Sequence, residues 1–196
     1  MSPGPSGAGP GLTSGAVPGD GPAPTAPLAT VDLGVTEVVL RRAARPDLPA
    51  LVALLATDDL GSTRDGIRSA ADRDAYERAF RAIDADPAQL LVVAETDGRV
   101  AGTLQLSFIP GLSRRGALRA QIEAVRVAPA LRSQGLGQAL FTWAIAEAGR
   151  RGCALVQLTT DKSRTDAHRF YERLGFVATH EGLKLDLTDG NGSVFR

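Results

Sequence analysis

The sequence predicts a mixed α/β domain, in which an antiparallel front half is followed by strands that alternate with helices. Residues 90–95 and 100–108 are apolar, β-branched runs, and the tetrapeptide Thr-Asp-Gly-Arg between them is a hairpin turn signal. Residues 118–127 and 153–158 are two further apolar runs, and an amphipathic helical pattern follows each of them. This order of elements predicts a central mixed sheet of about six to seven strands with helices on both faces.

The remaining elements are predicted from the same periodicities, in chain order. Residues 36–42 have the composition of a first strand. In the helical run that follows, the prolines fall in the first turn, where a helix tolerates them. Helices are expected at 46–55, 74–84, 136–150 and 166–174, and two last strands at 176–180 and 183–187.

The chain is expected to hold one domain, at 35–188, between a disordered tail at 1–34 and a short polar tail at 189–196. The first 28 residues contain seven Gly and seven Pro and almost no large apolar side chains, so they cannot offset the entropy cost of ordering. The segment also lacks the charged start and apolar centre of a signal peptide, and no apolar run in the chain is long enough to span a membrane. We therefore expect a cytoplasmic protein with no membrane partner.

Composition argues against several classes of function. The formal net charge is zero, so no general surface for DNA is indicated. Cys153 is the only cysteine, which excludes an internal disulfide, and two histidines provide no metal-ligand spacing, so no metal is expected. Arg outnumbers Lys by twenty to two, which suits a bacterial genome rich in G and C.

A strand, a glycine loop and a helix start follow one another at residues 125–138. In the segment Arg132-Ser-Gln-Gly135-Leu-Gly137, the glycines let a ligand approach the backbone amides without obstruction by a Cβ atom. The first turn of the next helix adds unpaired N–H groups and the positive end of the helix dipole. This arrangement predicts a binding site for a pyrophosphate. A Walker loop would need Gly-Lys-Ser/Thr here, and a dinucleotide fingerprint would need a small residue in place of Leu140.

A second segment, 166–176, supplies the context for this loop. It reads Asp-Ala-His-Arg-Phe-Tyr-Glu-Arg-Leu-Gly-Phe, and one helical face of it is shared by Ala167, Phe170, Tyr171 and Leu174. The patterns Arg-x-x-Gly-x-Gly and Ala-x-x-Phe-Tyr-x-x-x-Gly-Phe, in this order and separated by a strand, resemble the two signatures of the GNAT superfamily of N-acetyltransferases. The resemblance covers residues 36–187. It implies the GNAT fold, in which the strands at 118–127 and 153–158 splay around coenzyme A.

In the GNAT superfamily, the glycine loop holds the pyrophosphate of coenzyme A, and the preceding strand holds the pantetheine through backbone hydrogen bonds. The resemblance therefore implies that acetyl-CoA is the acetyl donor, with one amide of this strand facing the thioester oxygen. The residues that it assigns to acetyl-CoA are Val125, Arg126, Val127, Arg132, Ser133, Gln134, Gly135, Leu136, Gly137 and Gln138.

The resemblance also points to two catalytic residues. Tyr171 matches the tyrosine that lies at the thioester sulfur, and its phenol is expected to act as the acid for the departing thiolate. Glu123 is assigned as the base, since the two-residue period of a strand puts it on one face with Val125 and Val127. Two other roles stay open for Glu123, a water relay and an anchor for the substrate ammonium. Gln121, expected on the same face, could position a water.

One residue departs from the pattern of the superfamily. Many members carry Asn seven residues before the tyrosine, whereas this chain has Arg164. Arg164 could reach a phosphate of coenzyme A, but a solvated loop cation is the simpler interpretation, so Arg164 is left out of the predicted site.

The implied function is the transfer of an acetyl group from acetyl-CoA to a primary amine, by direct attack in a ternary complex of a monomer or homodimer. A small-molecule amine is favoured as acceptor. The alternatives are a protein or aminoacyl-tRNA acceptor, and a non-catalytic regulatory module that binds coenzyme A. The acceptor is not identified, because the acidic residues that would suit a cationic amine are equally typical of exposed loops, namely Asp58, Asp59, Asp65 and Glu181.

Overall fold

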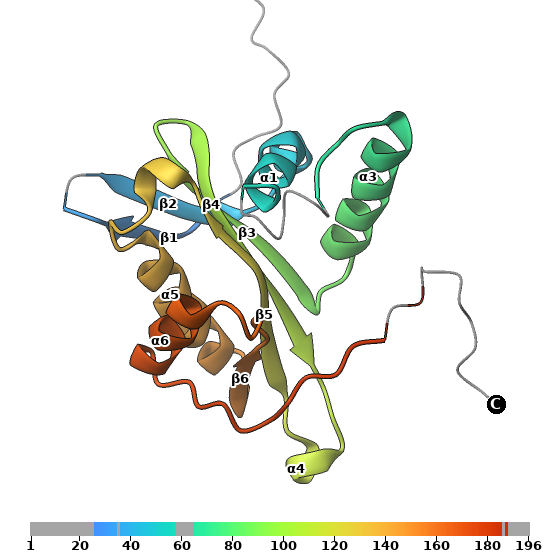
Figure 1. The fold of residues 1–196 in the computed structure, drawn as a ribbon, viewed down its shortest axis with the longest axis vertical. Coiled ribbons are helices and arrows are strands. Elements are labelled where there is room, and N and C mark those ends of the chain that lie inside the picture. Colours follow the sequence, from blue (N-terminus) through green and yellow to red (C-terminus); the bar gives the residue numbers. More distant parts are fainter. Residues whose placement is uncertain (1–25, 35, 58–64, 186, 188–196) are drawn as a thin grey trace, which may run out of the picture.

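The computed structural model describes residues 26–34, 36–57, 65–185 and 187. At its centre is a six-stranded sheet with the strand order β1-β2-β3-β4-β5-β6. The strands are β1 (Pro27–Asp32), β2 (Glu37–Arg42), β3 (Gln89–Thr96), β4 (Arg99–Ile109), β5 (Arg119–Val127) and β6 (Leu155–Leu158). Neighbours from β1 to β5 are antiparallel, and β6 is parallel to β5 (Figure 1). The predicted mixed sheet with an antiparallel front half is confirmed.

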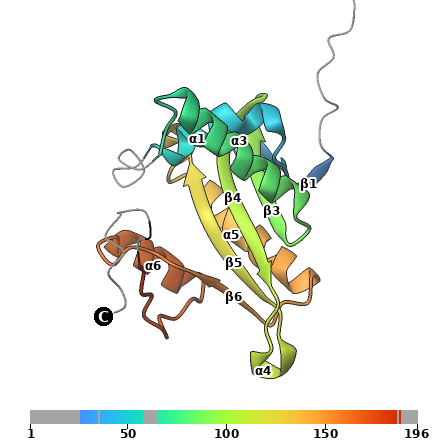
Figure 2. The ribbon, with the colours of Figure 1, turned by 90° about the vertical axis from the view of Figure 1, so that its right-hand side faces the viewer.

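Helices cover both faces of the sheet. α1 and α3 lie side by side on one face, α5 lies on the other, and α6 follows β6 (Figure 2). The helices are α1 (Leu48–Leu55), which follows a 3-10 turn (Arg45–Asp47), α3 (Ala70–Ala85), α4 (Ser113–Gly116), α5 (Leu136–Arg150) and α6 (Thr165–Arg173). α3 begins before the predicted residue 74, because Ser69 Oγ accepts a hydrogen bond of 3.1 Å from the amide of Asp72. That N-cap lies outside the apolar pattern that predicted the helix.

Two apolar clusters hold the layers together. The main core lies between the sheet and α5, and its fully buried members include Val92, Leu104, Leu106, Leu136 and Leu140. The smaller cluster lies beneath α1 and α3 and contains Leu48, Leu51, Val52, Phe80 and Val93. Successive residues of β3, such as Val92 and Val93, thus belong to opposite faces, as the pleat of a strand requires.

The sheet begins earlier in the chain than the predicted domain boundary at residue 35. β1 is an antiparallel neighbour of β2, and Ala29, Val31 and Leu33 pack against the main core. The alternation of a strand is therefore present in these residues, but it is short and follows a stretch dominated by Gly and Pro. Residues 1–25 of the predicted tail, and the predicted tail at 189–196, lie outside the described residues.

The two strands predicted at 176–180 and 183–187 do not form in the described part of the chain. Residues 176–185 have no regular secondary structure there, and Asp186 lies outside the description. Leu183 and Leu185 are 94% and 63% exposed. Their alternation with Lys184 is typical of a strand, but a strand also needs a partner, and the described part of the sheet ends at β6.

Candidate active site

β5 and β6 separate halfway along β5. Their parallel pairing runs from Arg119 opposite Leu155 to Ile122 opposite Leu158, where β6 ends. β5 continues to Val127, and among the described residues no strand pairs with its outer edge beyond Ile122. Figure 2 shows β6 diverging from β5 toward α6. The backbone N–H and C=O groups along that edge are therefore available to a ligand that binds as a strand would.

A β-bulge at Ala124 lies where this unpaired edge begins. Ala124 has a φ of +53°. On β4, Gln105 lies opposite Glu123 and Thr103 lies opposite Arg126, so two steps along β4 match three steps along β5. One extra residue is thus accommodated in β5, which reverses the alternation of its side chains at this point.

The bulge places Glu123 and the two valines on opposite faces of the sheet. Gln105, the partner of Glu123, lines a pocket beneath α1 and α3. Val125 and Val127 instead pack against the main core on the α5 face. The prediction that Glu123 shares a face with Val125 and Val127 is wrong, because a strict two-residue period does not allow for the extra residue. Glu123 reaches the side of α1 and α3, while the valines line the side of α5.

The loop before α5 has the backbone conformation of an anion-binding turn. Ser133 and Gly135 are left-handed, with φ of +63° and +89°, and Gly135 is the N-cap of α5. The first backbone bond of the helix runs from the amide of Ala139 to the carbonyl of Gly135 at 3.0 Å. The amides of 136–138 precede that bond and carry the positive end of the helix dipole, as a pyrophosphate requires. Leu136 is fully buried and offers only its backbone.

Glycine serves a different purpose at each of the two positions in this loop. At Gly135 the positive φ of +89° favours glycine. Gly137 is helical, and a Cβ atom there would lie 4.0 Å from Val127 Cγ2 and 4.0 Å from Phe170 Cζ. It would therefore enter the space between β5 and α6. Glycine at 137 keeps this space open next to the helix terminus.

The polar side chains of the loop contact neighbouring backbone. Arg132 Nε donates to the carbonyl of Val127 at 3.3 Å, and its Nη2 lies 3.5 Å from Thr57 Oγ1. Gln134 Nε2 donates to the carbonyl of Ala130 at 2.7 Å. Exposed side chains in the loop belong to Arg132, Ser133, Gln134 and Gln138. Arg132 thus stands beside the helix terminus, within reach of an anion after rotation of its side chain.

Tyr171 is held in an aromatic cluster made of four rings, which come from α5, from α6 and from Phe176, three residues after the end of α6. Its ring centroid lies 5.4 Å from that of Phe141, 5.5 Å from Phe170 and 6.2 Å from Phe176. Gly175, with a φ of +89°, ends the helical segment as predicted, and the amide of Phe176 donates to the carbonyl of Tyr171 at 3.0 Å. This turn returns Phe176 to the cluster. Tyr171 is therefore fixed by packing on several sides.

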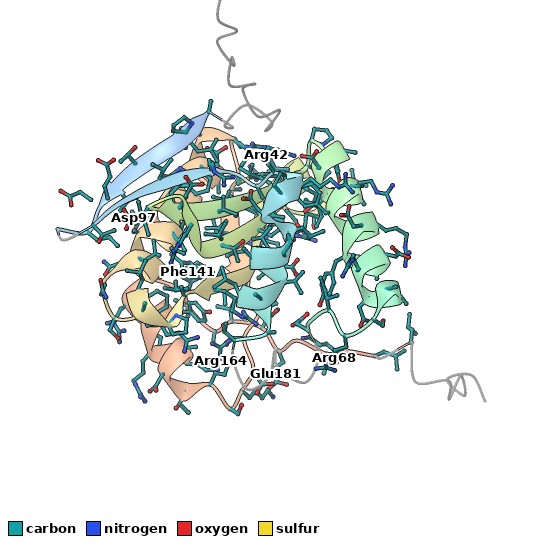
Figure 3. The ribbon with its side chains drawn as sticks, turned by 90° about the horizontal axis from the view of Figure 1, so that it is seen from above. Arg42, Arg68, Asp97, Phe141, Arg164 and Glu181 are labelled. Carbon is teal, nitrogen blue, oxygen red and sulfur yellow. The ribbon has the colours of Figure 1, made fainter. Side chains whose placement is uncertain are left out.

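Burial of Tyr171 favours the protonated form of its hydroxyl. Burial raises the pKa of Tyr171 above its ordinary value of about 10, and the positive charges of Arg164 and Arg126 oppose this shift. Arg164 is an exposed cation before α6 (Figure 3), as predicted, and its positive charge acts to lower the pKa of Tyr171.

Glu123 is exposed, whereas its predicted companion Gln121 is not. Gln121 is 9% exposed, and its Oε1 accepts a hydrogen bond of 2.7 Å from Nε2 of Gln157 on β6. The side-chain oxygen of Gln121 is thus engaged in holding β5 to β6, and the expectation that it positions a water has no support from its contacts. Of these three residues, Glu123 presents the chemically available group on this face.

Comparison with known proteins places the chain in a family. Residues 56–176, which contain both signatures, match the acetyltransferase (GNAT) family. The chain belongs to this family. The GNAT identity confirms the predicted fold, and it makes the protein an acetyl-transferring enzyme.

Three relatives show how far the likeness extends. The aminoalkylphosphonate N-acetyltransferase of Salmonella typhimurium is 34% identical over 109 residues, which are 56% of this chain and 70% of that protein. The glucosamine 6-phosphate N-acetyltransferase of Trypanosoma brucei brucei is 36% identical over 90 residues, 46% of this chain and 59% of that protein. The crystal structure of a transcriptional regulator from Bacillus halodurans C-125 matches with a TM-score of 0.72 and 47% identity, over 76% of this chain and 99% of that one.

No group of three or more His, Cys, Asp and Glu side chains in the described segments could hold a metal ion. None of the helices in those segments is both long and apolar enough to cross a membrane.

Proposed function

We propose that this GNAT enzyme transfers an acetyl group from acetyl-CoA to the primary amine of a small molecule, by direct attack within a ternary complex. One juxtaposition carries the proposal. The unpaired edge of β5 leads from Glu123 to the glycine loop at the start of α5, and Tyr171 packs against the same core as Val125 and Val127. A donor site and a proton-donating side chain thus lie on one side of β5, and a carboxylate lies on the other.

The residues along the unpaired edge of β5 and at the start of α5 fit successive parts of the acetyl-CoA molecule. The amides of 136–138 would hold the pyrophosphate, with the Arg132 guanidinium beside them. The backbone of Val125 and Val127 would hold the pantetheine as a neighbouring strand would. When bound, acetyl-CoA supplies the activated acetyl group. An amide of the unpaired edge would then stabilise negative charge on the thioester oxygen.

Tyr171 would donate its hydroxyl hydrogen to the departing sulfur. A thiol has a pKa of about 8.5, whereas burial holds the pKa of Tyr171 above its ordinary value of about 10. Complete transfer of the proton from Tyr171 to a free thiolate is therefore uphill by at least about 2 kcal/mol. Tyr171 acts chiefly through a hydrogen bond that strengthens as charge develops on the sulfur.

Glu123 would accept the proton that the amine must lose, directly or through a water. A free alkyl amine has a pKa of about 10.4, so only about one molecule in 2,500 is neutral at pH 7. The exposed carboxylate of Glu123 can first attract the ammonium form and then receive its proton. Its place at the start of the unpaired edge supports this role.

A small amine is the acceptor that the relatives favour. The Salmonella and Trypanosoma proteins are both named for small amines that bear a phosphonate or phosphate. We place the reaction in the cytoplasm, since a thiol such as Cys153 suits a reducing interior. A regulatory module that binds acetyl-CoA is the second candidate, because the Bacillus halodurans relative is named a transcriptional regulator.

Free-thiol release separates these candidates. The full chain is incubated with acetyl-CoA and a panel of primary amines, while calorimetry measures acetyl-CoA binding in parallel. An enzyme releases thiol in an amine-dependent way. Tight binding of acetyl-CoA without release for any small amine, peptide amine or aminoacyl-tRNA would favour the regulatory module, and absence of binding would contradict both candidates.

A further inference from the structure

A small apolar pocket lies between α1, α3 and the sheet, on the face opposite α5. Its volume is about 80 Å³. α1 and α3 form its outer wall, side by side in both views (Figures 2 and 3). Its lining residues are Leu48, Leu51, Val52, Leu55, Tyr76, Ala79, Phe80, Ile83, Leu91, Thr103, Gln105 and Ala124.

Two residues of the pocket lining are neighbours of Glu123, the proposed base. Ala124, the bulge residue, and Gln105, the strand partner of Glu123, both line it. Because directly paired residues of antiparallel strands project to the same face, Glu123 lies on the face of the sheet that holds the pocket, next in sequence to Ala124 of its lining. An amine held by Glu123 would therefore have its substituent next to the pocket.

Three polar side chains of the lining are hydrogen-bonded within the protein. Thr103 Oγ1 donates to the carbonyl of Val92 at 2.9 Å. The Tyr76 hydroxyl accepts from the amide of Gly66 at 3.1 Å and donates to Asp65 Oδ1 at 3.2 Å. Gln105 Nε2 donates to Gln89 Oε1 at 2.9 Å. No Lys or Arg is among the described lining residues, so the pocket offers an apolar surface and no counter-ion for a phosphate.

We infer that the acceptor is a primary amine whose substituent is apolar and fills this pocket. The inference rests on the proposed function, because it concerns the acceptor of that same reaction. A volume of about 80 Å³ is roughly half that of an apolar cavity of about 150 Å³ that binds benzene. The substituent is thus an alkyl group of three to four carbons, or the edge of a ring. This differs from the anionic acceptors named for the Salmonella and Trypanosoma relatives.

A series of unbranched amines of increasing chain length tests the inference. With acetyl-CoA saturating, thiol release is measured for methylamine, ethylamine, propylamine, butylamine and pentylamine, with 2-aminoethylphosphonate and glucosamine 6-phosphate as anionic comparators. Each methylene that enters the pocket should raise kcat/KM about fourfold, until the pocket is full. A series without this rise, or a higher kcat/KM for the anionic amines than for butylamine, would overturn the inference and leave the proposed function intact.

A pair of variants on α3 shows whether the pocket is responsible. Ala79 lines the pocket and is exposed, so Ala79→Leu fills the space without disturbing the buried core. We expect kcat/KM for butylamine to fall about tenfold, with methylamine changed less than twofold. Ala82→Leu, at an exposed position of the same helix that does not line the pocket, makes the same chemical change and is the control. Equal effects of both variants would contradict the assignment.

Direct binding keeps this test separate from catalysis. If acetyl-CoA binds but no amine of the panel releases thiol, the proposed function fails, and the pocket is then judged by calorimetry with butylamine alone. Binding to the wild type that Ala79→Leu weakens and Ala82→Leu preserves would support an apolar amine site. Absence of binding to the wild type, or equal binding by all three proteins, would overturn it.

Discussion

The two sides of β5 are built to recognise their ligands in different ways. Toward α5 and α6, the proposed donor site consists of a strand edge, the amides at a helix start and two glycines. Toward α1 and α3, the proposed acceptor site consists of apolar side chains and one carboxylate. Backbone recognition needs few residue types at fixed spacing and therefore leaves a motif in the sequence. Recognition by packed side chains tolerates many combinations and leaves none.

The largest effect should come from the hydroxyl group on the donor side. Tyr171→Phe removes one oxygen from the aromatic cluster, and kcat should fall about 100-fold, near the lower end for a proton-donating group. Acetyl-CoA affinity should change less than twofold, since the ring stays in place. Steady-state kinetics and calorimetry measure the two quantities.

A tyrosine hydroxyl can also be removed on the acceptor side, as a comparison. Tyr76→Phe removes a hydroxyl that bonds Gly66 and Asp65 at the pocket. It should raise the KM of the amine and change kcat by less than about threefold, because this hydroxyl does not face the sulfur in the proposed arrangement. Similar losses of kcat in Tyr171→Phe and Tyr76→Phe would contradict the division between the two sides.

The next effect concerns the space that Gly137 leaves open. Gly137→Ala should weaken acetyl-CoA binding about 5- to 100-fold, because its methyl group enters the gap between Val127 and Phe170. The protein should not be destabilised, since alanine favours a helix by about 1 kcal/mol over glycine. Gly149→Ala is the matched control in α5, as a Cβ atom there meets no described atom within 4 Å. Unchanged affinity in a folded Gly137→Ala protein would remove the donor site from this gap.

A smaller effect, which depends on pH, is expected from the carboxylate on the acceptor side. Glu123→Gln should lower kcat about tenfold at pH 6.5, where nearly all of the amine is protonated, and much less at pH 9.5. The profile is measured with one alkyl amine at saturating acetyl-CoA. A deficit that is equal at both pH values and confined to the KM of the amine would make Glu123 a binding residue.

The last prediction affects stability rather than activity and concerns the wall of the acceptor side. Burial alone would raise the pKa of Asp47, but hydrogen bonds from Arg41 and from the amide of Ala44 outweigh burial and lower it. Arg41 Nη1 and Nη2 donate to Asp47 at 2.7 and 2.8 Å, which ties β2 to the start of α1. Because the folded chain holds this proton less tightly, the stabilisation is present above about pH 4 and is lost as pH falls below the lowered pKa.

Asp47→Asn should therefore lower the free energy of unfolding by about 3 kcal/mol at pH 7, and its difference from the wild type should shrink toward pH 3. Urea unfolding at several pH values measures this. Asp84→Asn breaks an exposed pair with Arg42 at 3.3 Å and should cost less than about 1 kcal/mol. A loss for Asp47→Asn that does not vary with pH would show that the ion pair is not its cause.

Sequence periodicity and turn chemistry predict most of the fold, because those signals are local. The hairpin at Asp97 and Gly98 has positive φ at both residues, as Asp-Gly suggests. The helix at 165–173 ends before Gly175 for the same kind of reason. Features that depend on partners are the ones that were not predicted. β1 needs the edge of β2, and the alternation at 183–185 has no described edge to join.

The candidate site shows the same difference between features with a local sequence signal and features that depend on the folded chain. In the segment 132–138 the positive φ of Gly135 agrees with its residue type, whereas Ser133 is also left-handed, which its residue type does not indicate. The two-residue period puts Glu123 on the wrong face, because the sequence gives no sign that Ala124 adopts a positive φ. In the sequence Arg164 is indistinguishable from an ordinary exposed cation, and only the folded chain shows its charge near Tyr171.

The bulge at Ala124 also determines how this enzyme tolerates genetic change. Deleting that one codon would restore the simple alternation of β5, so that Glu123 and the residues after Ala124 could no longer both keep their present faces. Either the carboxylate would turn toward the apolar core, or the valines would turn toward the amine. Substituting Ala124 preserves the residue count, and with it the register. An in-frame deletion at this codon should therefore be far more damaging than most replacements there, and natural length variation should be confined to the loops that flank the strand.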